Sequence, residues 1–396
     1  MFQNDNFSAS CSNVTPTTDH KNPDYCTTFK LVVDVYVVAC LSFFGIIGNI
    51  LSIFVLGREK RIRETAFLLQ VIATADIMYL TTCLFFQSIN AIDLCTQWLP
   101  NMKTLWPRME PYVWPMASIA QTCTTWFVVL LTAERYVAIC KPLTALMSEP
   151  SRLRRLTLLV FVVALLYNLP RFFERETRME TCKDAVKYVA YRTPLRNNKY
   201  YIVIYKTSLY LLLRYFVPIS LLAFFNARLI HSILRSSKLQ RSGSTRSRSS
   251  QATCHKKMDR KRFTFMLIAA VVAVSVLCGL PDFFLRIWIS ITTLTGRKPT
   301  NRNVLRYNII SNLFLTVNSS VNFLIYCVLG KKFRENLLLM VCRSRQQSFT
   351  SQAIRLRRIE SRPSTSRNTR RRSHTSSELI SQNVPRKQWR EEELYG

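Results

Sequence analysis

The chain has 396 residues, of which 48% are hydrophobic, and a formal net charge of +32 at pH 7. Its apolar residues are gathered in long blocks, whereas a soluble domain spreads them along the sequence. A helix needs about 20 apolar residues to cross about 30 Å of hydrocarbon, and several blocks reach that length. The composition therefore excludes a large soluble domain and indicates a polytopic membrane protein.

Seven apolar blocks predict an all-α membrane protein with seven transmembrane helices. They lie at residues 31–56, 65–90, 111–138, 156–173, 200–230, 263–292 and 307–329. We expect the bundle over 31–342, an extracellular tail over 1–30 and a disordered cytoplasmic tail over 343–396. A short amphipathic eighth helix is expected at 331–340, lying in the plane of the membrane.

The expected orientation rests on loop charges, sequons and the tail. The inner loops are basic, but so is the loop between spans six and seven. The difference in Lys and Arg content between the two sides, on which the positive-inside rule depends, is therefore modest. Sequons at Asn6 and Asn13 are useful only outside the cell. The basic, serine-rich tail suits kinases and the anionic lipids of the cytoplasmic leaflet. We expect a multi-pass plasma-membrane protein with its N-terminus outside and its C-terminus inside.

The expected topology places some cysteines outside the cell and others within the membrane or inside the cell. Cys11, Cys26, Cys95 and Cys182 lie outside, where disulfides persist, and four cysteines allow three pairings. Cys342 ends the segment of the expected eighth helix and is a site for palmitoylation. A plain juxtamembrane cysteine is the alternative interpretation.

Charged and polar residues inside the spans indicate functional positions. Glu134-Arg135-Tyr136 closes span three, and an ion pair at a membrane boundary is costly without partners or a role. The alternative is that these charges only mark the end of the helix. The buried carboxylate of Asp76 in span two must face protein, water or a cation. For Asn49 in span one, hydrogen bonding between helices is the favoured interpretation.

Two prolines interrupt the later spans, and span seven ends in a polar motif. Pro218 in span five and Pro281 in span six each remove one helical hydrogen bond and kink their helices. Such kinks supply pivots for the inner halves of the helices. The motif that closes span seven runs from Asn322 through Phe323 to Tyr326.

Together these motifs resemble the rhodopsin-like (class A) G-protein-coupled receptors. Span seven is similar to their Asn-Pro-x-x-Tyr motif, with Phe323 in place of proline. The resemblance implies coupling to a heterotrimeric G protein through Glu134, Arg135 and Tyr136, with arrestin and receptor kinases as further partners. It also implies a polar core able to hold an allosteric sodium ion at Asp76, Thr124, Asn318 and Asn322. The implied activation core comprises Asn49, Asp76, Thr124, Pro218, Pro281, Asn318, Asn322 and Tyr326.

Some positions depart from the family's pattern. Span six carries Gly279 where the family usually has an aromatic residue. We therefore expect that this chain cannot use an aromatic side chain at that position as its activation switch. Lys261 stands where an acid often holds the span-three arginine, with Asp259 nearby. We therefore expect restraint of Arg135 to rely on Glu134 alone.

Longer strings narrow the resemblance. Ala117 replaces the aspartate of amine receptors, and Thr316 replaces the retinal-binding lysine of opsins. Residues 111–115, 167–174 and 312–323 look like the invertebrate receptors for FMRFamide-related neuropeptides, and the resemblance covers about 31–342. That group also lacks the span-three cysteine, here Glu110. This leaves Cys95 as the implied partner of Cys182.

The sequence therefore predicts a cell-surface receptor for a short amidated neuropeptide, which catalyses no reaction and binds no nucleic acid. Membrane lipids are expected at the basic segments. A receptor for another peptide or a lipid is one alternative, and a channel or transporter is another.

An amidated Arg-Phe end offers a guanidinium and an aromatic ring, so its pocket should supply a carboxylate beside aromatic walls. Asp282 is the leading carboxylate, and the alternative is that it pairs with Arg286 one turn away. The other expected contacts are Glu110, Glu174, Gln87, Gln121, Trp114 and Trp288.

Overall fold

The structure is a computed structural model. It describes residues 28–58, 63–96, 102–141, 150–182, 185–242, 248–296, 301–330 and 333–340. Within these ranges, seven helices are long and apolar enough to cross a membrane, which confirms the predicted bundle. The expected tail, glycosylation and palmitoylation sites at 1–27, Asn6, Asn13, Cys342 and 343–396 lie outside the described residues.

The first two spans are each built from several helical segments. Span one comprises α1 (Thr28–Lys30), η2 (Leu31–Val37) and α2 (Val38–Gly57). Span two comprises α3 (Arg63–Thr82), η3 (Cys83–Ser88) and α4 (Ile89–Thr96). The segments η2 and η3 are π-helical, a geometry that is frequent at functional sites.

Spans three to seven complete the bundle. Span three is α5 (Met102–Cys140), and span four is α7 (Pro150–Asn168) with the 3₁₀ turn η4 (Leu169–Phe173). Span five comprises the π-helical η5 (Tyr201–Leu209) and η6 (Leu212–Phe216), followed by α9 (Val217–Ser242). Span six is α10 (Arg248–Thr295), and span seven is α11 (Asn301–Leu329).

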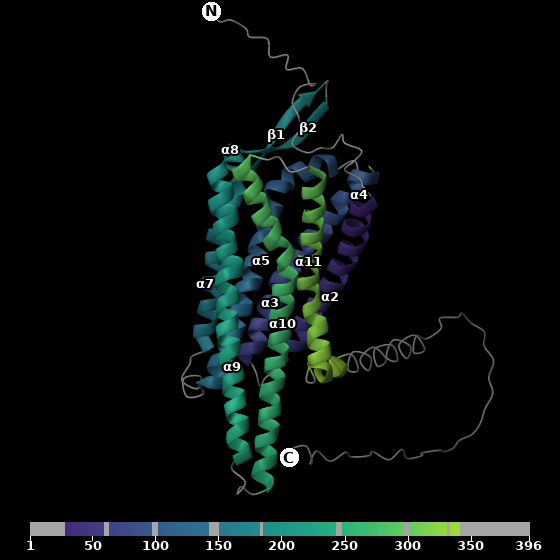
Figure 1. Ribbon diagram of the computed structural model, residues 1–396. Coiled ribbons are helices and arrows are strands. Elements are labelled where there is room, and N and C mark those ends of the chain that lie inside the picture. The colour runs from purple at the N-terminus through teal and green to yellow at the C-terminus, as the bar shows by residue number, and fades with distance from the viewer. Residues whose placement is uncertain are drawn as a thin grey trace, which may run out of the picture. The chain divides into compact units, whose positions relative to one another are not determined.

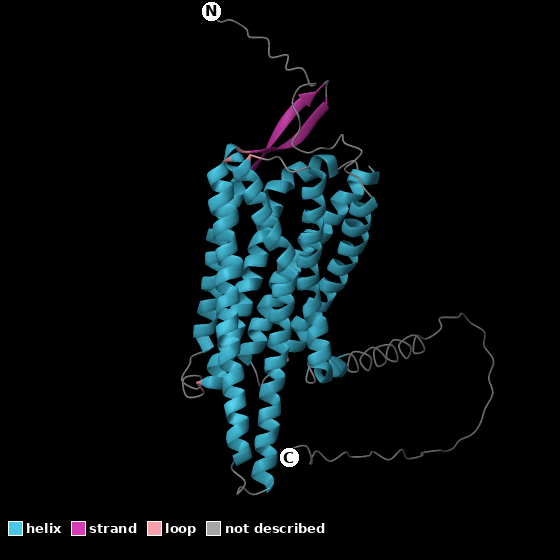
Figure 2. Cartoon of the chain, in the orientation of Figure 1, coloured by secondary structure: helices cyan, strands magenta, loops and turns pink. Residues whose placement is uncertain are grey.

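An antiparallel hairpin, which the sequence did not predict, covers one end of the bundle. Its strands β1 (Arg175–Cys182) and β2 (Ala185–Arg192) pair from Arg175 opposite Arg192 to Cys182 opposite Ala185. The short helix α8 (Pro194–Asn197) leads from it into span five. Figure 1 shows β1 and β2 beyond one end of the helices, while α9 and α10 extend together past the other. Figure 2 shows them as the only strands among the described residues. We call these the hairpin end and the opposite end.

Span three begins nine residues earlier than expected, at Met102 instead of residue 111. The helix contains Pro107, Pro111 and Pro115, and a proline that lacks its N–H leaves a carbonyl one turn earlier without its helical donor. The carbonyl of Pro107 accepts a hydrogen bond at 2.6 Å from the Thr177 hydroxyl of β1. The hairpin therefore satisfies a group that the proline leaves unpaired, and the helix continues.

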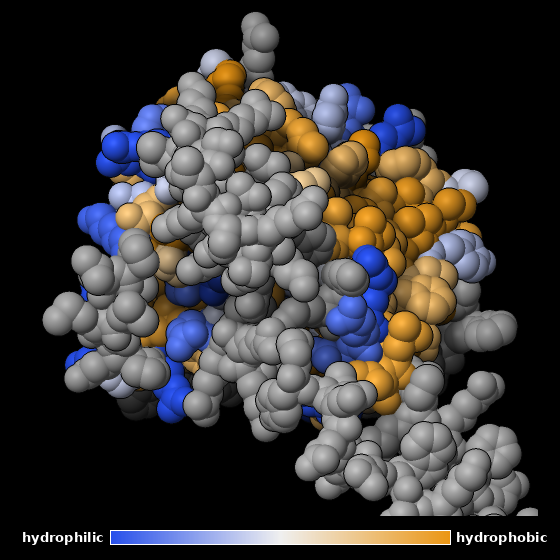
Figure 3. Space-filling view, turned by 90° about the horizontal axis from the view of Figure 1, so that it is seen from below, coloured by the Kyte–Doolittle hydropathy of each residue, from blue (hydrophilic) through white to orange (hydrophobic). Residues whose placement is uncertain are grey.

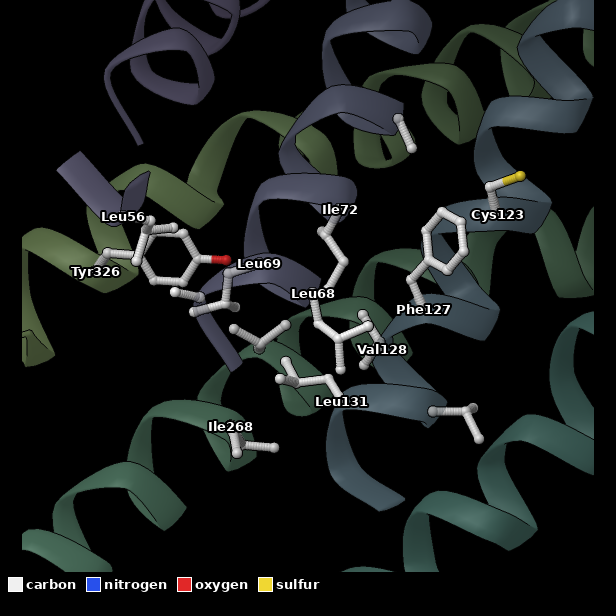
Figure 4. Close-up of a cluster of buried hydrophobic side chains, with 14 of the residues drawn as sticks. Leu56, Leu68, Leu69, Ile72, Cys123, Phe127, Val128, Leu131, Ile268 and Tyr326 are labelled. Atoms are coloured by element: carbon white, nitrogen blue, oxygen red, sulfur yellow. The ribbon is translucent and has the colours of Figure 1, made fainter. Parts of the chain in front are cut away.

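The main apolar core lies where spans two, three, six and seven meet. Figure 4 shows Leu68 and Ile72 of α3, Leu131 of α5, Ile268 of α10 and Tyr326 of α11 directed toward one another. Each is no more than 2% exposed. This contact holds together the helices that carry the polar residues of the site.

Large apolar side chains also cover the outside of the bundle. Phe44 and Phe54 are 69% and 62% exposed, and Leu158 is 62% exposed. In Figure 3, hydrophobic residues line the flank that the grey atoms leave visible. An apolar surface of this extent needs lipid around it.

After span seven, residues 333–340 are helical. Phe333 is buried and its ring lies 5.7 Å from the ring of Tyr326. Residues 331–332 and the chain after 340 lie outside the described part. The eighth helix over 331–340 therefore stays a prediction.

Candidate functional site

A cavity of about 450 Å³ opens within the helices toward the hairpin end. Its volume falls in the range of ligand pockets, about 300–1,000 Å³. Six of the seven residues predicted to contact ligand line it: Gln87, Glu110, Trp114, Gln121, Glu174 and Asp282. Trp288 is not among the lining residues and instead packs edge-on against Tyr307, with ring centroids 5.3 Å apart.

Asp282 lies at the centre of a hydrogen-bond network between spans five, six and seven. It is 2% exposed, and its Oδ2 accepts hydrogen bonds from Tyr210 at 2.7 Å and Tyr215 at 2.9 Å. Its Oδ1 accepts from Arg286 Nε at 3.2 Å and from the Ser311 hydroxyl at 3.4 Å. The internal pair with Arg286, expected as the alternative, is present in the structure.

Glu174, directly after η4, is held by residues that follow the hairpin. Its carboxylate accepts hydrogen bonds from Lys206 at 2.7 Å, Tyr201 at 3.0 Å and Arg196 at 3.4 Å. Burial alone would raise the pKa of Glu174, but the charges of Lys206 and Arg196 outweigh burial and bring its pKa below the ordinary value. Burial and the neighbouring Arg175 together lower the pKa of Arg196 to about 10.

The remaining predicted contacts have varied surroundings. Glu110 in α5 forms an ion pair with Arg175 at the start of β1. Gln87 donates a hydrogen bond to Asp34 Oδ1 at 2.9 Å, which links spans two and one. Trp114 is 37% exposed. The carboxylates proposed for a ligand guanidinium thus already have partners within the protein.

The predicted polar core lies in the middle of the bundle, around Asp76. This carboxylate is fully buried and accepts hydrogen bonds from Asn322 Nδ2 at 2.7 Å and Thr124 Oγ1 at 3.2 Å. Asn49 donates instead to the carbonyls of Gly45 and Ser319, both at 2.9 Å, which is the interhelical bonding favoured for it.

Two other members of the predicted core, Asn318 and Tyr326, lie on span seven. Asn318 borders a void of about 40 Å³ together with Thr124 and Pro218. Tyr326 is 2% exposed, and its hydroxyl has no hydrogen-bond partner among the described atoms.

A monovalent cation fits the surroundings of Asp76. The hydrogen bonds to its carboxylate come from the amide of Asn322 and the hydroxyls of Thr124 and Ser319, none of which neutralises its charge. A buried carboxylate is stable when a cation balances that charge. The hydroxyl of Thr124 supplies a further oxygen of the kind that a sodium ion prefers.

Arg135 is tied to its neighbour near the opposite end of α5. Glu134 accepts hydrogen bonds from Arg135 Nε at 2.6 Å and from Nη2 at 3.1 Å. Thr65 of α3 donates to the same carboxylate at 3.2 Å, so Glu134 is itself braced by span two. The ring of Tyr136 lies 5.5 Å from Phe225 of α9. The side chains of Asp259 and Lys261 lie outside the described part of the chain.

Space filling explains two departures from the family's pattern. A Cβ on Gly279 would lie 2.8 Å from Cε1 of Tyr215, so span five supplies an aromatic ring next to the position that lacks one. A Cβ on Gly48 would lie 2.8 Å from Cβ of Phe323, the residue that replaces proline. Gly279 thus leaves room for a ring from span five, and Gly48 leaves room for the residue that replaces proline.

Sequence reasoning missed the basic and tyrosine residues that surround the predicted acids. Arg171, Arg196, Lys206, Tyr210 and Tyr215 are the main ones. A signal for one of them was available, because ionisable residues such as Lys206 are rare within apolar spans and mark functional positions. Cys95 and Cys182 belong to α4 and β1, but their side chains are outside the described set, so their pairing stays a prediction.

Seven membrane-crossing helices, a cavity at one end and a restrained arginine near the other define a seven-helix membrane receptor. The family model described as 7 transmembrane receptor (rhodopsin family) matches residues 48–326, and the chain belongs to this family. It is therefore a receptor and not an enzyme.

Three relatives place the chain within the family. It is 30% identical over 305 residues to the "FMRFamide receptor" of Drosophila melanogaster, covering 76% of this chain and 52% of that protein. It is 28% identical over 300 residues to the "FMRFamide peptide receptor frpr-18" of Caenorhabditis elegans, covering 75% and 66%. It is 25% identical over 374 residues to "Sex peptide receptor-related protein 2" of Caenorhabditis elegans, covering 89% and 79%. The chain matches about half of the first relative's length and just under two thirds of the second's, and the predicted resemblance to FMRFamide receptors is confirmed.

Proposed function

We propose that this chain is a plasma-membrane receptor for a short amidated peptide of the FMRFamide type and that it activates a heterotrimeric G protein. The observation that carries the proposal is the cavity of about 450 Å³ beneath the hairpin, in a chain similar to two FMRFamide receptors. Four carboxylates and seven basic side chains line this cavity. Such a lining disfavours the lipid alternative, because charged groups gain little from an apolar ligand.

The peptide enters from the hairpin end, which is the extracellular side in this proposal. Gln121 and Trp114 of α5 contact its apolar parts, while Asp282 shapes the cavity through Tyr210 and Arg286. A ligand shifts the equilibrium between two receptor states only by its difference in affinity for them. The network around Asp282 joins spans five, six and seven, so a change in the cavity is transmitted to those helices.

Signalling depends on the opposite, cytoplasmic end. About 25 residues of α5 separate Glu110 from Arg135, or nearly 40 Å at about 1.5 Å per residue. Arg135 therefore cannot touch a ligand bound in the cavity. Release of Arg135 from Glu134 makes the guanidinium available to the G protein, and bound G protein raises peptide affinity by linkage. Receptor kinases and arrestin act on the tail. Asp76 would hold a sodium ion, which would balance the buried charge in the resting state.

The proposal is tested on cells that express the full chain. Matched peptides ending in Phe-Met-Arg-Phe, one amidated and one with a free carboxylate, are applied to these cells and to cells without the receptor. We expect a second-messenger response to the amidated peptide only, and only in expressing cells. A receptor that reaches the surface but responds to no peptide of an amidated library would overturn the proposal.

A further inference from the structure

Arg171 is a buried cation in the cavity wall that forms no ion pair of its own among the described residues, although its charge acts on the nearby carboxylate of Glu174. Arg171 lies in η4, is 9% exposed, and takes part in none of the ion pairs among the described residues. One guanidinium nitrogen donates to the Ser118 hydroxyl at 3.1 Å. The other two nitrogens, Nε and Nη2, are buried without a hydrogen-bond partner among the described atoms. Two of the three nitrogens of this charged group therefore lack a hydrogen-bond partner, and the residue lines the cavity.

Tyrosine rings shape the position of this guanidinium. Its central carbon lies 5.4 Å from the ring centre of Tyr210 and 5.9 Å from that of Tyr205. These contacts hold a cation in place, but a ring face does not satisfy N–H donors that point elsewhere. Arg171 borders both the main cavity and a void of about 40 Å³ behind Trp114. Its unpaired nitrogens are thus next to space that a ligand can fill.

Among the described residues that line the cavity, basic side chains outnumber acidic ones. Its basic lining residues are Lys30, Arg171, Arg175, Arg192, Arg196, Lys206 and Arg286, and its acidic ones are Asp34, Glu110, Glu174 and Asp282. The described part of the lining therefore carries an excess of three positive charges.

Each of the four carboxylates already faces a cation. Glu110 pairs with Arg175, and Asp282 pairs with Arg286. Asp34 interacts with Lys30. Glu174 serves both Lys206 and Arg196. Arg171 is the buried cation that this pairing leaves over.

Water alone does not remove this imbalance. Oε2 of Glu110 is also buried without a partner, and the void of about 40 Å³ has room for a water that bridges it to Arg171. Such a water would satisfy hydrogen bonds, but the charge of Glu110 is already matched by Arg175. A buried charge without a counter-ion is costly, and an anion bound beside it removes that cost.

We propose that Arg171 is the centre of an anion subsite in the cavity and that an acidic side chain of the peptide ligand occupies it. The planar guanidinium matches a carboxylate in bidentate geometry. Amidation removes the terminal carboxylate of the peptide, so the anion must be an aspartate or glutamate side chain. This inference rests on the proposed function and adds a ligand feature that the Arg-Phe end does not supply.

The first test uses matched peptide pairs on cells that express the full chain. Each pair ends in Phe-Met-Arg-Phe-amide and differs only by Asp or Asn at one preceding position. For at least one position we expect the wild type to favour Asp about tenfold or more, the size of one charge-assisted hydrogen bond. In Arg171→Gln the preference falls to about twofold or less, while Arg171→Lys keeps part of it. The control is Arg178→Gln, which changes an exposed arginine outside the cavity and keeps the full preference.

The second test needs no peptide, so it decides the subsite even if the proposed function fails. Purified wild type and Arg171→Gln are melted with sodium succinate or sodium chloride at equal ionic strength. We expect succinate to stabilise the wild type more than the variant, because a bound carboxylate neutralises Arg171. Equal stabilisation of both proteins would overturn the subsite. Equal potency of Asp and Asn peptides at every position, with both active, would overturn its role in ligand recognition but leave the peptide receptor intact.

Discussion

Asp282 and Arg286 lie one turn apart in α10, and Nε of Arg286 donates a hydrogen bond to Oδ1 of Asp282 at 3.2 Å. The same carboxylate accepts hydrogen bonds from Tyr210 and Tyr215 of span five. It therefore joins two spans at the level of the cavity. Because Asp282 has this many partners within the protein, its main role is to fix the shape of the cavity, and any effect on the ligand follows from that shape.

We expect Asp282→Asn to destabilise the receptor before it changes any ligand contact. Removing one partner of a buried ion pair leaves the other unpaired and costs about 3–5 kcal/mol. The melting temperature of the purified protein should fall, together with peptide potency. Tyr215→Phe removes one hydrogen bond to the carboxylate and should have a smaller effect of about 1 kcal/mol. A large loss of potency in Asp282→Asn at an unchanged melting temperature would instead indicate direct contact with the peptide.

Gly279→Ala should disturb the same network from the other side. The new Cβ would lie 2.8 Å from Cε1 of Tyr215, so the ring must move and weaken its hydrogen bond to Asp282. Overpacking of this kind costs about 1–3 kcal/mol, measured as a lower melting temperature. The control is Gly57→Ala, where the nearest atom is the end of the Gln70 side chain at 3.1 Å. Equal effects of the two substitutions would contradict the role given to Tyr215.

Glu174 should stabilise the receptor in a pH-dependent way. Its pKa is lower in the folded protein than its ordinary value of 4.5, despite the burial that opposes this. Its stabilising contribution is therefore complete above that value and is lost as the pH falls through the folded pKa. The gap in melting temperature between wild type and Glu174→Gln should therefore narrow as the pH falls below about 5.

The control for this experiment is Glu176→Gln, which removes the exposed partner of Arg178 at the base of the hairpin. Exposed ion pairs contribute little, so this variant should match the wild type at every pH. If the gap for Glu174→Gln keeps its full size in strong acid, the assignment of the lowered pKa to Glu174 is wrong.

Sodium should weaken agonist binding through Asp76. A cation at this carboxylate joins α3 to the hydrogen-bond partners in α5 and α11 and opposes their separation. Replacing choline by sodium at constant ionic strength should lower agonist affinity about fivefold or more, a typical coupling between sites. Asp76→Asn should abolish the effect. Sodium dependence that survives in Asp76→Asn would place the ion elsewhere.

Hydropathy alone predicted the seven spans, because lipid requires long apolar helices. The hairpin was missed because β1 reads Arg-Glu-Thr-Arg-Met-Glu-Thr-Cys and has no alternation of apolar residues. The start of span three was missed because the segment before Pro111 contains Pro107, a residue that usually ends or kinks a helix. The carbonyl of Pro107, which lacks a helical donor, accepts a hydrogen bond from Thr177. The two residues are 70 positions apart, so no local sequence pattern reveals this bond.

The acids of the candidate site were predicted, but their partners were not. Glu174 is held by Lys206 from span five, 32 positions later. Glu110 is held by Arg175, 65 positions later. Residue type and depth in a span can be read from sequence, whereas ion pairs between helices depend on how the helices rotate against one another. For this reason the expectation of carboxylates open to a ligand guanidinium was incomplete.

Nucleotide exchange on purified G protein, driven by receptor reconstituted in membranes, tests the central claim most directly. The claim is that peptide bound in the cavity acts on the G protein through Arg135, which Glu134 restrains at rest. Wild type should accelerate exchange when an amidated peptide is added, and Glu134→Gln should raise the basal rate without peptide. In Arg135→Ala, exchange should fall to the rate without receptor while labelled peptide still binds. Full peptide-driven exchange by Arg135→Ala would contradict the account. The charges of Glu134 and Arg135 would then only mark the end of the helix at the membrane boundary.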